Sequence, residues 1–290
     1  MENLFEKGCL VQLSIRKWGG IKKIDKSKLA QMVESPDWMH ATKKLVDPES
    51  LKPICKVGNA ARSYLATISL PFPIQGMLFV PKEMIARVDD KLTQFKVEFD
   101  IAVSDFINDY DDLRNTAMIH LRDLFNEIDY PVDIRSRYSF VWRFITLDIP
   151  NGNSKILAPE VYEREKEKFV QTMEEARELA ISSLREEFAS MVERITERFS
   201  PDSDGNAKIF KNSTVESFYD YFETFKERNI FNDQELQELV GRAKELLNGH
   251  SAQSIRSDGQ LKNHIKQGMR TVETAMVELF RRPRRKITLT

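Results

Sequence analysis

Cysteine is nearly absent from this chain of 290 residues, which contains only Cys9 and Cys55. Two thiols can form one bridge at most, so a disulfide-stabilised secreted scaffold is excluded, and we expect both to be buried and inert. No apolar run approaches the roughly 20 residues that a membrane-spanning helix needs. The first residues show no basic segment followed by a long apolar one, so no secretory signal is expected. These absences predict a soluble, cytoplasmic protein that does not enter a membrane.

Histidine is also scarce, and the four histidines at positions 40, 120, 250 and 264 are scattered. Paired cysteines and a His-Glu-x-x-His segment are both absent, so no zinc site is expected. Gly19 and Gly20 lack the lysine and the spacing of a phosphate-binding loop. Since no catalytic constellation can be identified, we expect no enzymatic activity, no cofactor and no metal.

Two acidic patterns imitate metal sites. Residues 202–206 (DSDGN) resemble the start of a calcium loop, but the sixth position is Ala207 instead of glycine and the twelfth is Ser213 instead of glutamate. Asp105, Asp109 and Asp112 have the spacing of one helix face, which could hold a cation or a basic partner. A polar loop and a solvated helix face are the simpler interpretations. In the same predicted helix, His120 is expected to be a packing or boundary residue.

Two long amphipathic helices dominate the pattern. From Pro81 to Ile128 the apolar residues are spaced by threes and fours, and no glycine or proline interrupts them. A helix over 81–128 would be about 70 Å long, which suggests a coiled-coil-like element. A second amphipathic helix is predicted over 159–199. The stripes of the two helices predict four buried phenylalanines, Phe99, Phe106, Phe169 and Phe188.

Two segments alternate with a period of two, at 9–16 and 139–149, and both are rich in branched or aromatic residues. We expect them to pair in one sheet, because a lone strand cannot satisfy its backbone. The predicted fold is therefore α+β and predominantly helical, with a long antiparallel helical hairpin, a small β-sheet at one end and a C-terminal helical subdomain. The predicted segments are an N-terminal region of a strand and short helices (1–80), the hairpin with its intervening strand (81–200), short helices (201–249) and a helix with a basic tail (250–290).

The C-terminal region is locally basic although the whole chain has a net charge of only −1. Residues 250–290 hold nine Lys or Arg residues against three acids. Five of these cations lie in the tail and could each neutralise a phosphate, namely Arg281, Arg282, Arg284, Arg285 and Lys286. A solubilising end is the alternative interpretation.

Several segments together resemble an uncharacterised family of bacterial and phage proteins, catalogued as a domain of unknown function. They are LVQLSIRKWGGIKKI, LVDPESLKP, VPKE before a long helix, and AKIFKNSTVESFYDYFETFKERNI. The resemblance covers about residues 8–248 and excludes the basic tail. Genes of this family often lie near those of a MoxR-type AAA ATPase and a von Willebrand A-like protein. The resemblance therefore implies a role as a partner of such proteins, and it defines no catalytic residue.

The sequence thus predicts a non-enzymatic interaction or scaffold protein, of phage or mobile-element origin, acting as an adaptor or client of an AAA ATPase and von Willebrand A-type system. The alternative is a nucleic-acid-associated protein that uses its basic tail. Either role is compatible with an oligomer.

Overall fold

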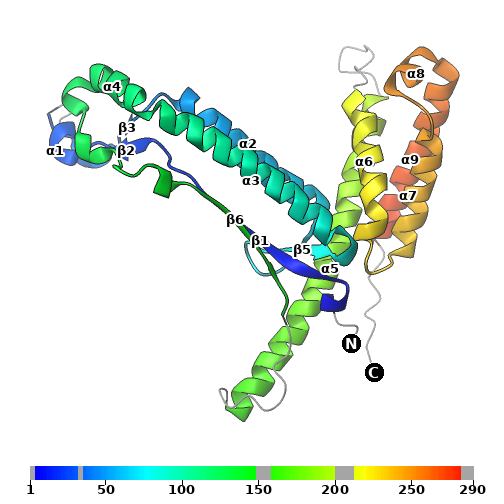
Figure 1. Cartoon of the computed structure of the whole chain (residues 1–290). Coiled ribbons are helices and arrows are strands. Elements are labelled where there is room, and N and C mark those ends of the chain that lie inside the picture. The colour runs from blue at the N-terminus through cyan, green and yellow to red at the C-terminus, as the bar shows by residue number, and fades with distance from the viewer. Residues whose placement is uncertain (1–3, 32–34, 148–157, 200–211, 282–290) are drawn as a thin grey trace. The chain divides into compact units, whose positions relative to one another are not determined.

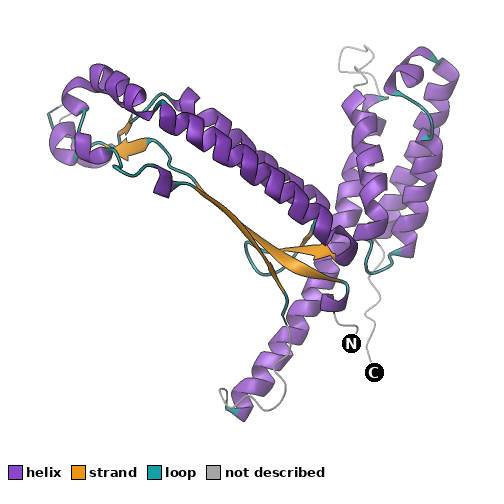
Figure 2. Cartoon of the chain, in the orientation of Figure 1, coloured by secondary structure: helices purple, strands orange, loops and turns teal. Residues whose placement is uncertain are grey.

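The computed structural model describes residues 4–31, 35–147, 158–199 and 212–281. The described chain is mostly helical and contains a small antiparallel sheet and a C-terminal helical region, so the predicted α+β class is confirmed (Figure 1, Figure 2). The chain also forms two compact units. Unit 1 comprises Met1–Leu10, Ile68–Met84 and Thr146–Thr290, and unit 2 comprises Val11–Thr67 and Ile85–Ile145.

These units are discontinuous in sequence, whereas the expected segments 1–80, 81–200, 201–249 and 250–290 follow the chain. Sequence periodicity identifies which residues form an element, but it does not identify the core that the element joins. The chain therefore passes from one unit to the other at positions where the amino-acid composition does not change.

Unit 2 is built on an antiparallel pair of helices, α2 (Pro48–Ile68) and α3 (Ile85–Asn108), which lie side by side in Figure 1. Near the end of α2, the ring of Tyr64 lies 6.0 Å from that of Phe95 in α3. The remaining elements of the unit are α1 (Lys26–Leu29), β2 (Ile21–Lys23), β3 (Thr42–Lys44), α4 (Tyr110–Leu121), β6 (Ser139–Ile145), η2 (Pro36–Trp38), η4 (Arg122–Leu124), η5 (Glu127–Asp129) and η6 (Arg135–Arg137).

The single helix expected over 81–128 is wrong. A 3-10 turn, η3 (Lys82–Met84), precedes α3, and the α-helix is interrupted at Asp109 before α4 begins. Asn108, Asp109 and their acidic neighbours favour turns because their side chains compete for backbone hydrogen bonds. The break also lets Tyr110 pack against the rings of Trp18 and Phe106, at 5.9 and 5.8 Å.

The expected hairpin between the helices at 81–128 and 159–199 is not confirmed. The structure places α3 in unit 2, paired with α2, and α5 (Pro159–Arg198) in unit 1. Three of the four phenylalanines, Phe99, Phe106 and Phe188, are buried as predicted. Phe169 is only half-buried, since the buried positions of α5 begin at Ala176. The coiled-coil interpretation is also not supported.

The prediction that the two period-two segments pair is confirmed. The main sheet has the order β4-β5-β1-β6, in which β1 (Gly8–Arg16) lies beside β6. The hairpin of β4 (Leu70–Pro71) and β5 (Leu78–Pro81) is antiparallel, with Leu70 opposite Phe79. A Cβ at Gly8 would lie 2.2 Å from the carbonyl oxygen of Val80, so the approach of β1 to β5 requires glycine. The part of the second segment beyond residue 147 lies outside the described residues.

Unit 1 contains a bundle of four helices, α5, α6 (Asn212–Arg228), α7 (Gln234–Leu247) and α9 (Gly259–Arg281). Each helix packs on two neighbours in the cyclic order α5-α6-α7-α9, and the short helix α8 (Ala252–Ser257) covers α6 and α9. The core is aromatic between α5 and α6, where Phe188 meets Phe218 edge-to-face at 6.4 Å. This bundle includes the predicted C-terminal helical region.

Candidate interaction surfaces

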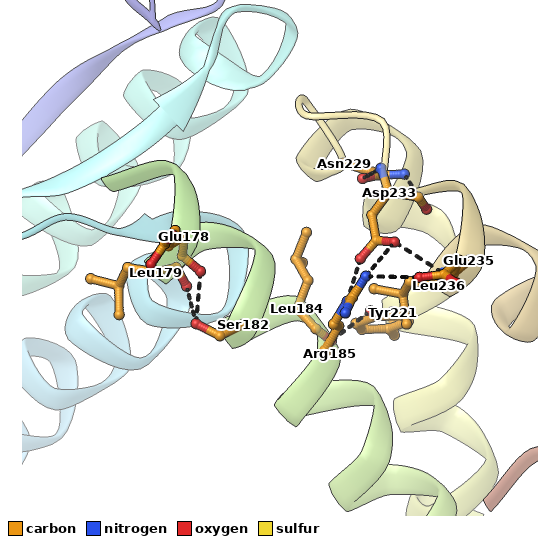
Figure 3. A network of polar contacts seen from close by, with 10 residues as sticks. All are labelled: Glu178, Leu179, Ser182, Leu184, Arg185, Tyr221, Asn229, Asp233, Glu235 and Leu236. Atoms are coloured by element: carbon orange, nitrogen blue, oxygen red, sulfur yellow. Dashed lines mark hydrogen bonds and ion pairs between the residues drawn. The ribbon is translucent and has the colours of Figure 1, made fainter. Parts of the chain in front are cut away.

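A polar network joins α5 to the start of α7 in unit 1 (Figure 3). Arg185 donates two hydrogen bonds to the carboxylate of Asp233, from Nε at 2.6 Å and from Nη2 at 2.9 Å. The same carboxylate caps α7 by accepting from the backbone N–H of Leu236 at 3.2 Å. Asn229 accepts from the backbone N–H of Asp233 at 2.8 Å, and Glu235 lies 3.6 Å from Arg185. The carboxylate of Asp233 thus caps the N-terminus of α7 and also forms the ion pair with Arg185.

The phenol of Tyr221 extends this network into the bundle core. Its ring stacks between those of Phe188 and Phe225, at 5.7 and 5.5 Å, and its hydroxyl donates to the backbone oxygen of Leu184 at 3.1 Å. Burial and the nearby carboxylate of Glu187 raise the pKa of Tyr221 well above its ordinary value. The phenol is therefore a neutral structural donor at any physiological pH.

Arg228, the last residue of α6, is the most deeply buried charge of the described chain. Its Nη2 donates to Glu187 of α5 at 2.6 Å, while Nε and Nη1 meet no acceptor among the described residues. The contacts of Arg185, Tyr221 and Arg228 each link two packed helices of the same bundle, so we interpret them as stabilising contacts.

An open groove of about 400 Å³ lies in unit 2 between the first turns of α2, the end of α3 and the start of α4. Its lining is apolar with an acidic rim, and it consists of Ser50, Pro53, Glu98, Ile101, Ala102, Asp105, Phe106, Asp109 and Leu113. Ile101 is 57% exposed and adds apolar surface to the groove. The groove therefore combines exposed apolar surface with negative charge.

A second set of exposed apolar side chains belongs to unit 2, on and around β2, η2, η5 and α4; Figure 1 shows β2 and α4 at one end of this unit. Trp38 is 91% exposed, Ile128 is 90% exposed and Val132 is fully exposed. We call these exposed residues together the apolar tip; they are Ile21, Trp38, Met39, Ile119, Ile128 and Val132. Large exposed apolar groups that gather in one region typically mark a binding surface.

The segment that carries Ile128 is held rigidly. Asp129 forms ion pairs with Lys43 at 2.6 Å and with Lys22 at 3.8 Å, and the Asp129 and Lys43 side chains are largely buried. The Asn126 side chain accepts a hydrogen bond from the backbone N–H of Ile128 at 3.1 Å. Tyr130 is buried against Phe125, with ring centroids 5.2 Å apart. The exposed side chains are thus displayed from an anchored segment.

The three aspartates expected on one helix face are divided between two helices. Asp105 lies on α3 and Asp112 on α4, with Asp109 at the break between the helices. Asp105 and Asp109 instead meet on the rim of the groove. Among the residues that the structure describes, no group of three His, Cys, Asp or Glu side chains could hold a metal ion.

Three other residues named from the sequence fall at separate places. His120 is exposed on α4, so its expected packing role is wrong. Cys9 is buried, and burial raises the pKa of its thiol. Cys55 is half-buried, and its Sγ accepts a hydrogen bond from Lys17 Nζ at 3.3 Å, a contact that sequence reasoning missed.

The remaining sequence candidates lie largely outside the described residues. They are the calcium-like loop at 202–206 and the basic tail, of which only Arg281, exposed at the end of α9, is described. No helix in the described parts of the chain is long and apolar enough to cross a membrane.

The sequence reasoning also missed the apolar tip, because an exposed apolar residue has no distinguishing local pattern. The row of aspartates at positions 105, 109 and 112 was the sequence signal that pointed to the region of the groove.

Comparison with known proteins places the chain in a family. The sequence pattern of "Protein of unknown function (DUF3150)" matches residues 5–198, about two thirds of the chain. No curated protein and no solved structure matches. The matched range includes β1, the α2–α3 pair and all of α5, and it therefore includes both the groove and the apolar tip. The chain belongs to the DUF3150 family.

Proposed function

We propose that this protein is a non-enzymatic interaction protein that docks a protein partner on the apolar tip of unit 2. The observation that carries the proposal is the exposure of Ile128, which lies on an anchored segment, together with that of Trp38 and Val132. Aromatic and aliphatic anchors in a preformed geometry supply most of the binding energy at protein interfaces. Because Asp129 and Tyr130 already fix the segment, binding would cost little ordering entropy.

The partner that we propose is a MoxR-type AAA ATPase, or a von Willebrand A-like protein acting with it, in the cytoplasm. This identity rests on the family resemblance of the sequence and on the chemistry of the tip, which suits a protein surface. The protein would act as an adaptor or client in an ATPase system of phage or mobile-element origin.

The test measures affinity for a purified MoxR-type ATPase encoded near a gene of this family, by biolayer interferometry. A tip variant carries Trp38→Ser, Ile128→Ser and Val132→Ser in the full chain. We expect its dissociation constant to rise at least tenfold, because interface anchors typically cost more than about 1.4 kcal/mol when truncated.

A matched control substitutes three exposed apolar residues of unit 1, as Ile74→Ser, Leu179→Ser and Val277→Ser. These side chains are 39%, 39% and 45% exposed, and this variant is expected to bind like the wild type. Equal losses in both variants, or undiminished binding by the tip variant, would contradict the proposal.

The nucleic-acid alternative stays a prediction about the basic tail. Neutralising Arg281, Arg282, Arg284, Arg285 and Lys286 should abolish any DNA binding and leave the melting temperature nearly unchanged; Arg281, which is exposed, illustrates why, since a solvated charge contributes little to folding. Such binding would weaken steeply as salt rises.

A further inference from the structure

The groove of unit 2 has the features of a receptor for a basic segment with one apolar anchor. Its floor is apolar and includes Ala102 and Phe106 of α3 and Leu113 of α4. Ile101 stands exposed at its edge, and Glu98, Asp105 and Asp109 are exposed on the rim. A ligand that places an apolar side chain on the floor and positive charges beside the rim carboxylates would therefore complement the groove.

The charge around the groove is one-sided. None of its lining residues is Lys or Arg. The segment 97–113 contains six acids and no Lys or Arg; the acids are Glu98, Asp100, Asp105, Asp109, Asp111 and Asp112. Lys52, beside the lining residue Pro53, is paired with Glu49 at 2.7 Å, and Lys96 is paired with Asp100 at 2.5 Å. The rim carboxylates therefore lack basic neighbours in the lining, and they attract cations from elsewhere.

The volume of the groove limits its occupant. About 400 Å³ is near the lower end of the range for ligand pockets, about 300–1,000 Å³, so it admits one or two side chains but not a helix. The chain's own end has this chemistry. Residues 281–290 (RRPRRKITLT) carry five cations, no acidic side chain, and Ile287 directly after the last cation.

We infer that the acidic groove of one copy binds the basic end, residues 281–290, of a second copy. The contact is heterologous, since a tail on one molecule enters a groove on the next, and each copy retains one free tail or groove. This surface differs from the apolar tip, so the inference and the proposed function can fail separately.

The first experiment is sedimentation velocity of the full chain over about 1–100 µM. We expect the sedimentation coefficient to rise with concentration at about 50 mM salt and to fall back at about 500 mM, because exposed charge pairs are screened. A groove variant (Asp105→Asn, Asp109→Asn) and a tail variant with the five tail cations replaced by Gln should each weaken self-association roughly tenfold or more. A control variant (Glu238→Gln, Glu245→Gln) alters two exposed acids of α7 and should associate like the wild type.

Mixing the two defective variants gives the sharper result. The tail variant still offers an intact groove and the groove variant still offers an intact tail, so an equimolar mixture should form heterodimers that do not extend further. Four results would overturn the inference: a wild-type monomer at about 100 µM in low salt, association that high salt leaves intact, a groove variant that associates normally, or a mixture that stays monomeric. A tail that binds DNA while the groove variant associates like the wild type would likewise overturn it.

Discussion

The ion pair between Arg185 and Asp233 offers a quantitative test of the bundle in unit 1. Asp233→Ser removes the carboxylate but leaves a hydroxyl that can still cap α7. Arg185→Met removes the guanidinium and keeps an apolar side chain of similar length. The double variant carries both changes, so the three variants separate the charge–charge interaction from the helix cap.

The structure sets the expected magnitudes. The Arg185 and Asp233 side chains are only 12% and 6% exposed, and breaking such a pair typically costs about 3–5 kcal/mol. Glu235 lies 3.6 Å from Arg185 and is 55% exposed, so it offsets part of the loss when Asp233 is replaced. We expect each single variant to lose about 2–3 kcal/mol. The double variant leaves no unpaired charge and should lose about the same, which implies a coupling energy of about 2–3 kcal/mol.

The assay is urea unfolding followed by far-ultraviolet circular dichroism, which reports all helices. Tryptophan fluorescence provides an internal control, because Trp18, Trp38 and Trp142 all belong to unit 2. Losses in the double variant that equal the sum of the single losses would refute a buried, coupled pair. A shift confined to the fluorescence signal would place the effect outside the bundle.

Three further predictions concern single sites. Burial raises the pKa of Tyr130 to about 12, so the protonated phenol stabilises the fold fully below about pH 10, and this stabilisation is lost as the pH rises toward 12. Tyr130→Phe should therefore reduce the alkaline fall of the urea midpoint. It should change the free energy of unfolding at neutral pH by less than about 1 kcal/mol, since the buried hydroxyl has no partner among the described residues. A thiol reagent should label one equivalent in the native protein, at Cys55, and two after unfolding; labelling of both thiols in the native state would refute this. Gly268→Ala should lower the melting temperature, because the added Cβ would lie 2.5 Å from the side chain of Leu246 in α7. In Gly241→Ala the added Cβ meets nothing within 4 Å, so this variant should stabilise α7 by about 0.5–1 kcal/mol. Equal effects of the two variants would contradict the close packing of α7 and α9.

The strands were predictable because their pattern is local. Alternation of branched residues from Leu10 to Ile15, and of aromatic and branched residues around Phe140, specifies extended backbone with two distinct faces. The pairing of these segments followed from the backbone's need for partners, and the structure confirms it.

The helix pairing was not predictable from periodicity, because an amphipathic stripe shows that a face is buried without showing what covers it. Phe99 and Phe188 both lie in such stripes and are both buried, yet Phe99 packs on Phe140 in unit 2 and Phe188 on Phe218 in unit 1. The break at Asp109 needed knowledge of where Tyr110 would pack.

The surfaces were harder to predict than the core. Ile128 and Val132 have the side chains of core residues, and tertiary contacts such as the buried Asp129–Lys43 pair are needed to show that Ile128 lies on an anchored segment with its side chain exposed. The aspartates at 105 and 109 were noticed as an acidic row, but the groove beside them depends on Pro53 and Leu113, which come from two other helices.

The most direct test of an interaction role is site-specific photo-crosslinking of the full chain to the purified MoxR-type ATPase. A photoreactive residue in place of Ile128 lies on the apolar tip, and one in place of Val277, which is also exposed, serves as the control on α9. We expect a covalent adduct with the ATPase from position 128 and none from position 277. Adducts from position 277 alone, or equal adducts from both positions, would contradict docking on the tip.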